Sequence, residues 1–501
     1  MAALSEVLAG AWEGLVLLLS WPNILYSLGG TLVAMCVAVL PGISGATLMA
    51  IAIPLTFSWE PLPIMLLFGA LVGGATFMGS TTAILFNIPG TGPNAATMLD
   101  GFPMAVQGRA RTALACSAAA SALGSTVGVL ALILLIPLIA VVEPHVGPPE
   151  LLMLSVWGLL SVATVIRTSL LPGLVTAGLG LLVSFVGFDP MTAEARFTLG
   201  TLSLQEGLGL IPVFVGVFAI AEVVQLLASG RTTISGSTEA RRLAGDTREG
   251  VLSVFRHFGV FLKSSLIGTG VGVVPGVGGT VAAFIAYGEA ARAAGRDGRF
   301  GEGDIRGVIA PEAANDAKDG GALLPTLAFG IPASAGTALL LVALQIHGVA
   351  PGPELMTSRL DLVFALIWSL FLANWVTSLL GLSVVGPLAA LSTVRTARLA
   401  PPILLLAAIG AFAYRGRVLD VWIAFGFGVV GYLMRRHGWP RITFIIALVL
   451  GPVVELNLNL SLRLHELDRI ELWSRPSVLA MAVLIAVTLI IPRASRLRRT
   501  P

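Results

Sequence analysis

Charged residues are scarce in this chain of 501 residues: they make up 11% of it, and lysine occurs only at Lys263 and Lys318. A soluble domain carries roughly a quarter charged residues, so this composition excludes an ordinary soluble protein. Hydrophobic residues make up 56% of the chain, and the mean hydropathy is +0.92. The net charge of +3 is too small to indicate nucleic acid as a partner. We therefore predict an all-α polytopic protein in a lipid bilayer.

Cysteine and the common catalytic motifs are also nearly absent. The two cysteines, Cys36 and Cys116, lie in apolar runs and indicate neither a disulfide framework nor a metal site. The chain has no HExxH, GxSxG or phosphate-binding P-loop motif, so we expect no enzyme, no ATP hydrolysis and no cofactor. The segment 5–20 has no basic residue before its apolar part, which favours an interfacial or first helix over a cleaved signal.

Helix-breaking residues interrupt the apolar sequence at four places that form two pairs. An Ile-Pro break occurs in Asn87-Ile-Pro89-Gly90-Thr91-Gly92-Pro93 and again in Gly330-Ile-Pro332-Ala-Ser334. A Pro-Gly break precedes each of them, in Pro41-Gly42-Ile-Ser44-Gly45 and in Pro275-Gly276-Val-Gly278-Gly279. Lipid tolerates irregular backbone only where protein or a water-filled cavity surrounds it. Breaks at corresponding positions of two halves indicate a transporter binding site, although a polar loop between spans is the simpler alternative for each.

The apolar runs predict about ten to fourteen transmembrane segments of ~20 residues. They are arranged as two repeats, each with Pro/Gly-broken helical hairpins. We divide the chain into a first membrane repeat (1–228), an Arg-rich cytoplasmic linker (229–257), a second repeat core (258–395) and C-terminal helices with a basic tail (396–501).

Arginine in short loops predicts the orientation of the spans, because cytoplasmic loops carry the excess of basic residues. The linker and the loop 292–306 flank the second Pro-Gly hairpin, so both its ends are expected on the cytoplasmic side. Residues 1–60 contain no Lys or Arg, which indicates that the first hairpin enters from outside. The two repeats would then be inverted relative to each other, although Arg109 and Arg111 fit this arrangement less well.

Small, hydroxyl and amide residues at the breaks are the candidate substrate ligands. Hydroxyl groups there are also common at helix–helix contacts in membranes, which is the structural alternative, and Gly90 and Gly276 would leave room for a ligand near the backbone. The predicted substrate-binding residues are Ser44, Ser80, Thr81, Asn87, Pro89, Gly90, Thr91, Gly276, Gly278, Pro332 and Ser334.

An acidic cluster precedes the second Ile-Pro break. Glu312, Asp316 and Asp319 share one face of a helix, and Asn315 lies beside them. Ionisable residues at membrane depth mark ion and substrate paths, so we predict that these four residues bind the coupling cation, Na⁺ or H⁺, with Lys318 neutralising one carboxylate. The alternative is a helix start at the interface, where Pro311-Glu312 suits the first turn. Asp100 is expected to cap a turn or to join an ion site.

These motifs together resemble the large, multi-spanning membrane subunit of the tripartite tricarboxylate transporters. The resemblance covers residues of about 20 to 490. It is carried by the two Ile-Pro breaks and by Asp100-Gly101-Phe102-Pro103 with Gly108-Arg109-Ala110, Pro311-Glu312-Ala-Ala-Asn315, and Gly320-Gly321-Ala-Leu-Leu-Pro325. The chain departs from the family pattern at Asp316, where a second Asn is frequent, and at Ala333, where Gly commonly follows Ile-Pro.

The resemblance implies secondary active import of a small organic anion, of the di- or tricarboxylate type, across the bacterial inner membrane. It implies a small membrane subunit and a periplasmic substrate-binding protein as partners, and it leaves open an oligomer. Helix N-termini at 88–90 and 331–333 would offer backbone N–H groups to the carboxylates. A stand-alone carrier without a binding protein is the alternative, and an intramembrane hydrolase is a remote one.

Overall fold

The computed structural model describes residues 2–40, 44–142, 145–164, 170–189, 191–229, 244–391, 400–467 and 475–497. Almost all of this part of the chain is helical. The one sheet within it is a short antiparallel hairpin of β1 (Gly187–Phe188) and β2 (Ala195–Arg196). The predicted all-α polytopic class is therefore confirmed.

The first half of the chain forms a series of helices that stop and restart at the predicted breaks. Residues 41–43 of the first Pro-Gly break lie outside the described residues, and the next helix starts directly after Ser44, whose Oγ accepts the N–H of Thr47 at 3.2 Å. The helices are α1 (Ala2–Leu19), α2 (Asn23–Ala38), α3 (Gly45–Leu55), α4 (Pro61–Gly74), α5 (Thr76–Phe86), α6 (Asn94–Val106) and α7 (Ala110–Val142).

A second group of elements follows before the linker. It comprises α8 (Pro148–Thr164), α9 (Leu171–Ser184), the β-hairpin, α10 (Leu202–Gln205), α11 (Leu210–Phe214), the π-helical segment η2 (Val215–Ile220) and α12 (Ala221–Ser229).

The second half of the chain, after the linker, is also a series of helices. Its elements are α13 (Thr247–Arg256), α14 (Phe258–Val273), α15 (Gly278–Ala294), the 3₁₀ turn η3 (Gly295–Asp297), α16 (Arg306–Phe329), α17 (Ala335–Ile346), α18 (Pro353–Ser358), α19 (Leu360–Leu391), α20 (Ala400–Arg415), α21 (Val418–Arg436), α22 (Arg441–Glu466) and α23 (Pro476–Leu497).

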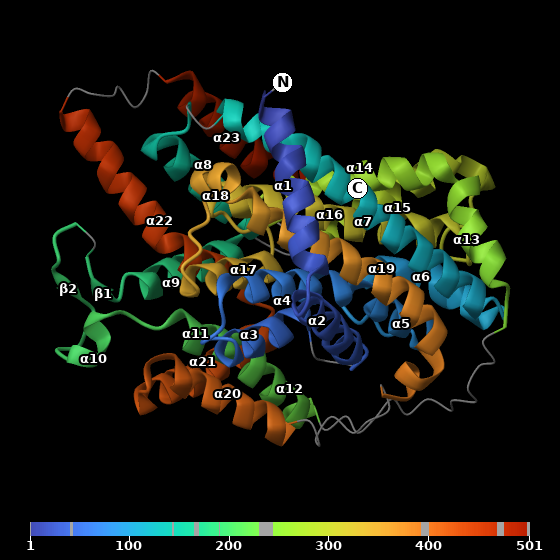
Figure 1. Cartoon of the computed structure of the whole chain (residues 1–501), viewed down its shortest axis with the longest axis horizontal. Coiled ribbons are helices and arrows are strands. Elements are labelled where there is room, and N and C mark those ends of the chain that lie inside the picture. Colours follow the sequence, from blue (N-terminus) through green and yellow to red (C-terminus); the bar gives the residue numbers. More distant parts are fainter. Residues whose placement is uncertain are drawn as a thin grey trace.

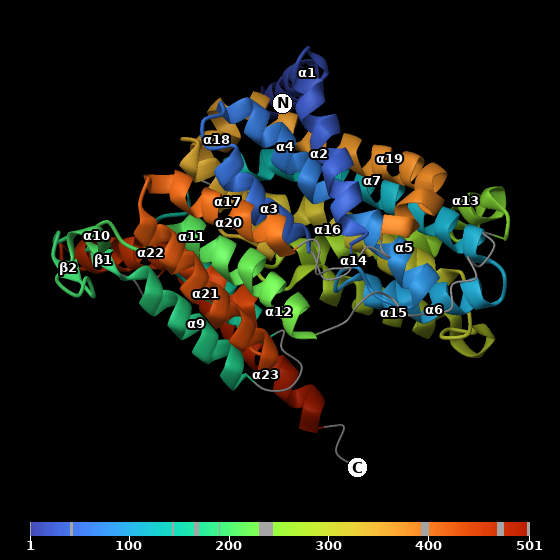
Figure 2. The same ribbon diagram turned by 90° about the horizontal axis from the view of Figure 1, so that it is seen from below.

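In each half, one helix packs both against a helix of its own half and against a helix of the other half. Helix α4 packs against α2 of its own half and against α19 of the other, while α16 packs against α14 of its own half and against α7 of the other. Likewise α3 contacts α17, and α6 contacts α15. Figures 1 and 2 place α5, α6, α14 and α15 on one side of the molecule and α9, α20, α21 and α22 on the other, with α16 and α17 between them. The inverted orientation of the two repeats stays a prediction.

Helix α16 is the buried centre of this arrangement because glycines let its neighbours approach closely. A Cβ atom at Gly268 or Gly272 of α14 would lie 2.2 Å from a carbonyl oxygen of α16. At Gly124 and Gly128 of α7 the corresponding distances are 2.6 and 2.5 Å. Small residues at helix interfaces permit such contacts in membrane proteins. The side chains of α16 are consequently enclosed on both sides.

Length and composition identify the helices that are able to cross a bilayer. Six of the described helices are long and apolar enough, and the number rises to eight if each of two bent helix pairs is counted as one span. Six shorter apolar helices of 10–17 residues lie among them, including α3 and α17, which follow the breaks. The chain is thus a multi-pass membrane protein, and the expected total of ten to fourteen segments stays a prediction.

The linker predicted at 229–257 is partly described. Its arginines at 231, 241 and 242 lie outside the described residues, whereas α13 packs along α7. A Cβ at Gly250 would lie 2.4 Å from the carbonyl oxygen of Thr112, and Arg109 pairs with Glu249 at 3.0 Å. The end of the linker is therefore docked on the first repeat. The domain boundaries stay a prediction.

The cytoplasmic placement of the basic loops is open to a labelling experiment. Single cysteines at Glu302 and Ala494, in a variant lacking Cys36 and Cys116, should react with a membrane-impermeant thiol reagent in inside-out vesicles and not in intact cells, because basic loops stay inside. Reaction of either site in intact cells would contradict the predicted orientation.

Candidate functional site

All four breaks meet at one cavity of about 550 Å³. The first Pro-Gly break contributes Ser44 and Gly45, and the second contributes the stretch 276–280. The first Ile-Pro break contributes the stretch 91–93, and the second contributes 334–336. Segments that are far apart in the sequence therefore line a single space, of the size that small-molecule sites usually have.

Five helices begin at the wall of this cavity. They are α3, α6, α15, α17 and α22, whose first residues are Gly45, Asn94, Gly278, Ala335 and Arg441. The first turn of a helix has N–H groups without intrahelical acceptors, and the helix dipole places partial positive charge there. Five such ends around one space make it favourable for an anion.

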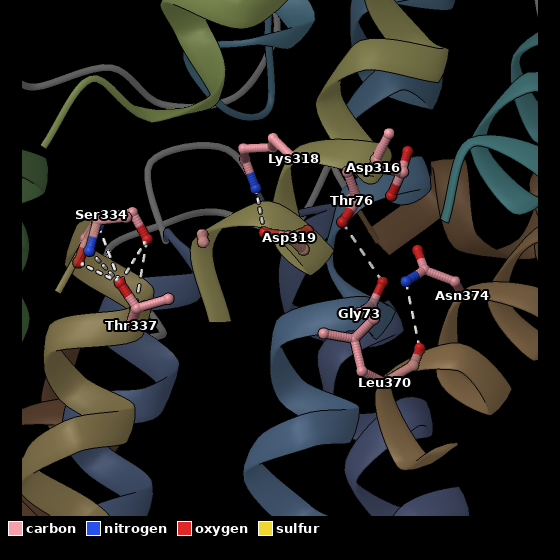
Figure 3. A network of polar contacts seen from close by, with 12 residues as sticks. Gly73, Thr76, Asp316, Lys318, Asp319, Ser334, Thr337, Leu370 and Asn374 are labelled. Carbon is pink, nitrogen blue, oxygen red and sulfur yellow. Dashed lines mark hydrogen bonds and ion pairs between the residues drawn. The ribbon is translucent and has the colours of Figure 1, made fainter. Parts of the chain in front are cut away.

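The start of α17 shows how these turns are held. Ser334 Oγ accepts the N–H of Thr337 at 3.2 Å, and Thr337 Oγ1 accepts the N–H of Ser334 at 2.8 Å (Figure 3). This reciprocal capping fixes the geometry of the helix end. Gly336, next to it, has only ordinary contacts at 3.8 Å around the place of a Cβ. The backbone at Gly336 therefore borders open cavity.

Two basic side chains reach the cavity wall. Lys318 of α16 is paired with the neighbouring Asp319 (Figure 3). Arg441 of α22 donates to the carbonyl oxygen of Val217 at 3.1 Å and to Glu222 Oε2 at 3.4 Å. Both cations already have carboxylate partners, so the favourable potential for an anion comes mainly from the helix ends.

Glu312 is fully buried and lies away from the cavity. Its Oε1 accepts the hydroxyl of Ser80 at 2.6 Å and that of Thr97, and its Oε2 accepts the hydroxyl of Ser117 at 2.8 Å. Asn94 in turn donates to Ser80 Oγ at 2.6 Å. The carboxylate of α16 thus joins α5, α6 and α7.

Of the predicted cation ligands, Asn315 and Asp319 line the cavity, whereas Glu312 and Asp316 are buried behind it. The Nδ2 donor of Asn315 is buried and has no acceptor among the described residues. Asp316 accepts the hydroxyl of Ser121 at 2.5 Å through Oδ2 only. The four residues are therefore not one ligand set, although they share one helix.

The predicted substrate residues also divide into two groups. Those at the cavity are Ser44, Thr91, Gly276, Gly278 and Ser334, and those that do not line it are Ser80, Thr81, Asn87, Pro89, Gly90 and Pro332. Thr81 is buried within α5.

Asn87 has a backbone role. It ends α5 in the left-handed conformation, with φ of 56°, and Gly330 ends α16 in the same way, with φ of 67°. Asn and Gly are the residues that most readily adopt this helix cap, and Ile-Pro follows both. The two Ile-Pro breaks are thus matched in conformation as well as in sequence.

The two glycines expected to leave room for a ligand are required by packing. Gly90 donates its N–H to the carbonyl oxygen of Gly79 at 3.2 Å, and a Cβ at Gly90 would lie 2.4 Å from the Cα of Gly79. A Cβ at Gly276, which has φ of 77°, would lie 1.7 Å from the side chain of Val162. Substitutions at these glycines would therefore disturb the fold before they affected a ligand.

Several residues of the cavity wall were not predicted from the sequence. Thr280 of α15 lies against the start of α6, since a Cβ at Gly92 would be 2.4 Å from Thr280 Oγ1. Arg441 and Thr443 come from α22, far along the chain from the breaks. A Pro followed by an apolar run, as at Pro440, indicates a helix start, but no local signal shows where that start lies in space.

Asp100 holds the loop after α15. Its Oδ1 accepts the N–H groups of Gly301, Gly303 and Asp304 at 2.8–2.9 Å, and its Oδ2 accepts the Tyr287 hydroxyl at 2.9 Å. Burial raises the pKa of Asp304, but hydrogen bonds from Arg306 outweigh it and leave that pKa below its ordinary value. With both its oxygens engaged by donors, Asp100 is an anchor for this loop, and a part in an ion site stays a prediction.

The geometry defines a polytopic helical membrane protein with a cavity formed by broken helices. Residues 24–446 match the model of the tripartite tricarboxylate transporter TctA family, and the chain belongs to that family. It is therefore a transporter subunit and not an enzyme, which removes the hydrolase alternative.

Two relatives from Agrobacterium vitis are similar to the chain. An uncharacterized 52.8 kDa protein in the TAR-I ttuC' 3'region is 32% identical over 474 residues, covering 94% of this chain and 93% of the relative. An uncharacterized protein in the TAR-II ttuC' 3'region is 29% identical over 228 residues, covering 45% of this chain and 94% of the relative. No solved structure matches the chain.

The network around Glu312 should be necessary for stability. Glu312→Ala would leave three buried hydroxyl groups without their acceptor, and each costs about 1–3 kcal/mol. We expect a thermal unfolding midpoint several degrees below that of the parent protein in detergent. Glu302→Ala, at an exposed position, serves as the control and should leave the midpoint unchanged. Equal midpoints for both variants would show that the network is not structural.

Proposed function

We propose that the cavity binds a small organic carboxylate, of the di- or tricarboxylate type, and that the chain imports it across the bacterial inner membrane with Na⁺ or H⁺ coupling. The observation that carries this proposal is the meeting of five helix N-termini at one cavity. Backbone N–H groups and helix dipoles bind carboxylates without the desolvation cost of an unpaired buried cation. Family membership supports the substrate class.

Two donors at the wall support recognition of more than one carboxylate. Among the described residues the buried Nδ2 of Asn315 has no acceptor, so a carboxylate oxygen bound at this wall would satisfy it. Lys318 is paired with Asp319 in the same wall, and an arriving anion would compete for its ammonium group. We infer that Asn315 contacts the substrate rather than the cation.

The transport partners follow from the family. A small membrane subunit and a periplasmic substrate-binding protein would complete the importer, with the binding protein delivering the acid to the outer face. A stand-alone carrier is the alternative. Uptake by the chain alone, without gain from the other two proteins, would favour that alternative.

Uptake into sealed vesicles tests the proposal directly. Vesicles carrying the chain with its two partners should accumulate a radiolabelled di- or tricarboxylate when a Na⁺ or a H⁺ gradient is imposed, each separately. A monocarboxylate of similar size is the matched control and should accumulate less, since it offers one anionic group to the helix ends. Absence of uptake under every gradient would refute the coupled importer.

Gly336 provides a substitution that changes the cavity and spares the packing. Gly336→Val would project two methyl groups into the open space, and we expect substrate affinity to fall at least about tenfold, or about 1.4 kcal/mol. Gly178→Val is the control, because nothing lies within 4 Å of the added Cβ in α9 and that helix is distant in sequence from the breaks. Substrate binding to purified protein measures the effect. Parent-like affinity of Gly336→Val would place the substrate elsewhere.

A further inference from the structure

The three acidic residues of α16 have different surroundings. Glu312 accepts three hydroxyl groups, and Asp319 is paired with Lys318. Asp316 is fully buried, and only its Oδ2 is engaged, by Ser121. Its Oδ1 has no donor among the described residues. Burying a carboxylate oxygen without a partner costs free energy. A further group that binds Asp316 would therefore stabilise the folded protein.

A second unpartnered oxygen belongs to Asn374 of α19. This residue is 1% exposed, and its Oδ1 has no hydrogen-bond partner in the described part of the chain. Its Nδ2 donates to the carbonyl oxygen of Leu370 at 3.2 Å. Flipping the amide group would place Oδ1 against that carbonyl oxygen and lose this hydrogen bond. In Figure 3 the carboxylate of Asp316 and the amide of Asn374 point toward each other. Two acceptors without a donor therefore face the same place.

The helices next to Asp316 also carry buried hydroxyl groups. Ser125 follows Ser121 by one helical turn on α7, which puts both on the face that contacts Asp316. Ser125 Oγ is buried and has no partner among the described residues. Thr76 of α5 appears next to Asp316 in the view of Figure 3 and gives its hydroxyl hydrogen to the carbonyl oxygen of Gly73 at 3.4 Å, which leaves its oxygen free to accept. The group as a whole offers oxygen lone pairs.

We propose that Asp316, Asn374, Thr76, Ser121 and Ser125 form a sodium-binding site. Hard cations take carboxylate, carbonyl and hydroxyl oxygens as ligands. One carboxylate among neutral oxygens balances a monovalent charge, whereas a buried divalent ion would keep an uncompensated charge. This site lies behind the cavity wall, and Thr76 belongs to both.

The position on α16 also provides a route for coupling. Asn315 and Asp319, which line the cavity, flank Asp316 on the same helix. A cation held by Asp316 would therefore fix the segment that presents Asn315 and Lys318 to the substrate. This inference rests on the proposed function, because it assigns the coupling ion of the same transport cycle.

Sodium binding is measurable on the purified full-length chain without any carboxylate. The unfolding midpoint should rise saturably with NaCl relative to choline chloride at constant ionic strength, because a ligand that binds the folded state stabilises it. In Asn374→Ala and Ser125→Ala the NaCl concentration that gives half of the effect should increase about tenfold or more. Asp316→Asn should abolish the effect.

Ser369→Ala is the matched control. Ser369 is a buried hydroxyl on α19 that donates to the carbonyl oxygen of Leu66 and not to the proposed site, so its loss should lower the midpoint without changing the sodium dependence. If Asn374→Ala fails to fold, Ser125→Ala decides, since it removes only an unpartnered hydroxyl.

Three results would overturn the site: no specific effect of sodium on the parent protein, a response to acid pH alone, or an unchanged half-saturation in the Asn374 and Ser125 variants. Sodium binding without uptake under any gradient would refute the proposed function and leave this site standing. Proton-driven uptake without sodium binding would refute this site and leave the proposed function standing.

Discussion

An interrupted helix inside a bilayer must find partners for its free backbone groups, and the rest of this structure depends on that constraint. Lipid supplies neither donors nor acceptors. The chain meets the constraint by gathering its breaks, so that α3, α6, α15 and α17 all begin at one cavity. The four breaks thus line one space, and capping side chains such as Ser44, Ser334 and Thr337 accept some of their N–H groups instead of leaving them to lipid.

Helix α16 connects the cavity to the surrounding helices through residues that lie close together along the helix. Glu312 holds three neighbouring helices through their hydroxyl groups. One turn later Asp316 has an oxygen without a partner in the described part of the chain, and Lys318 with Asp319 reaches the cavity. Close packing by the glycines of α7 and α14 prevents α16 from rotating freely. Each side chain is therefore confined to one environment, and that environment decides its role.

Local signals in the sequence predicted the helical membrane class and the places where helices stop. Pro275-Gly276 and Ile331-Pro332 break helices through their own covalent geometry, so their effect is readable without a structure. The hydrogen bonds of Glu312 could not be predicted from the sequence, because its partner Ser80 lies 232 residues away along the chain. The same holds for Arg441, which joins the cavity only through the packing of α22. The common face of Glu312, Asp316 and Asp319 suggested one ion site, whereas the structure gives the three carboxylates separate partners.

The separation of these carboxylates has a consequence for transport. A cation and an anion that met directly in the cavity would form a pair that could leave together or dissociate into water, and the protein would have little control over the order of events. Here Asp316 and Asn374, whose oxygens lack partners among the residues that the structure describes, are not part of the wall that Asn315 and Lys318 line. Occupation of one place would change the other through the backbone of α16, which is a coupling free energy between two sites and is reciprocal. Coupling would then be a property of one rigid, buried helix, and the helix ends around the cavity would remain free to accept acids of different shape.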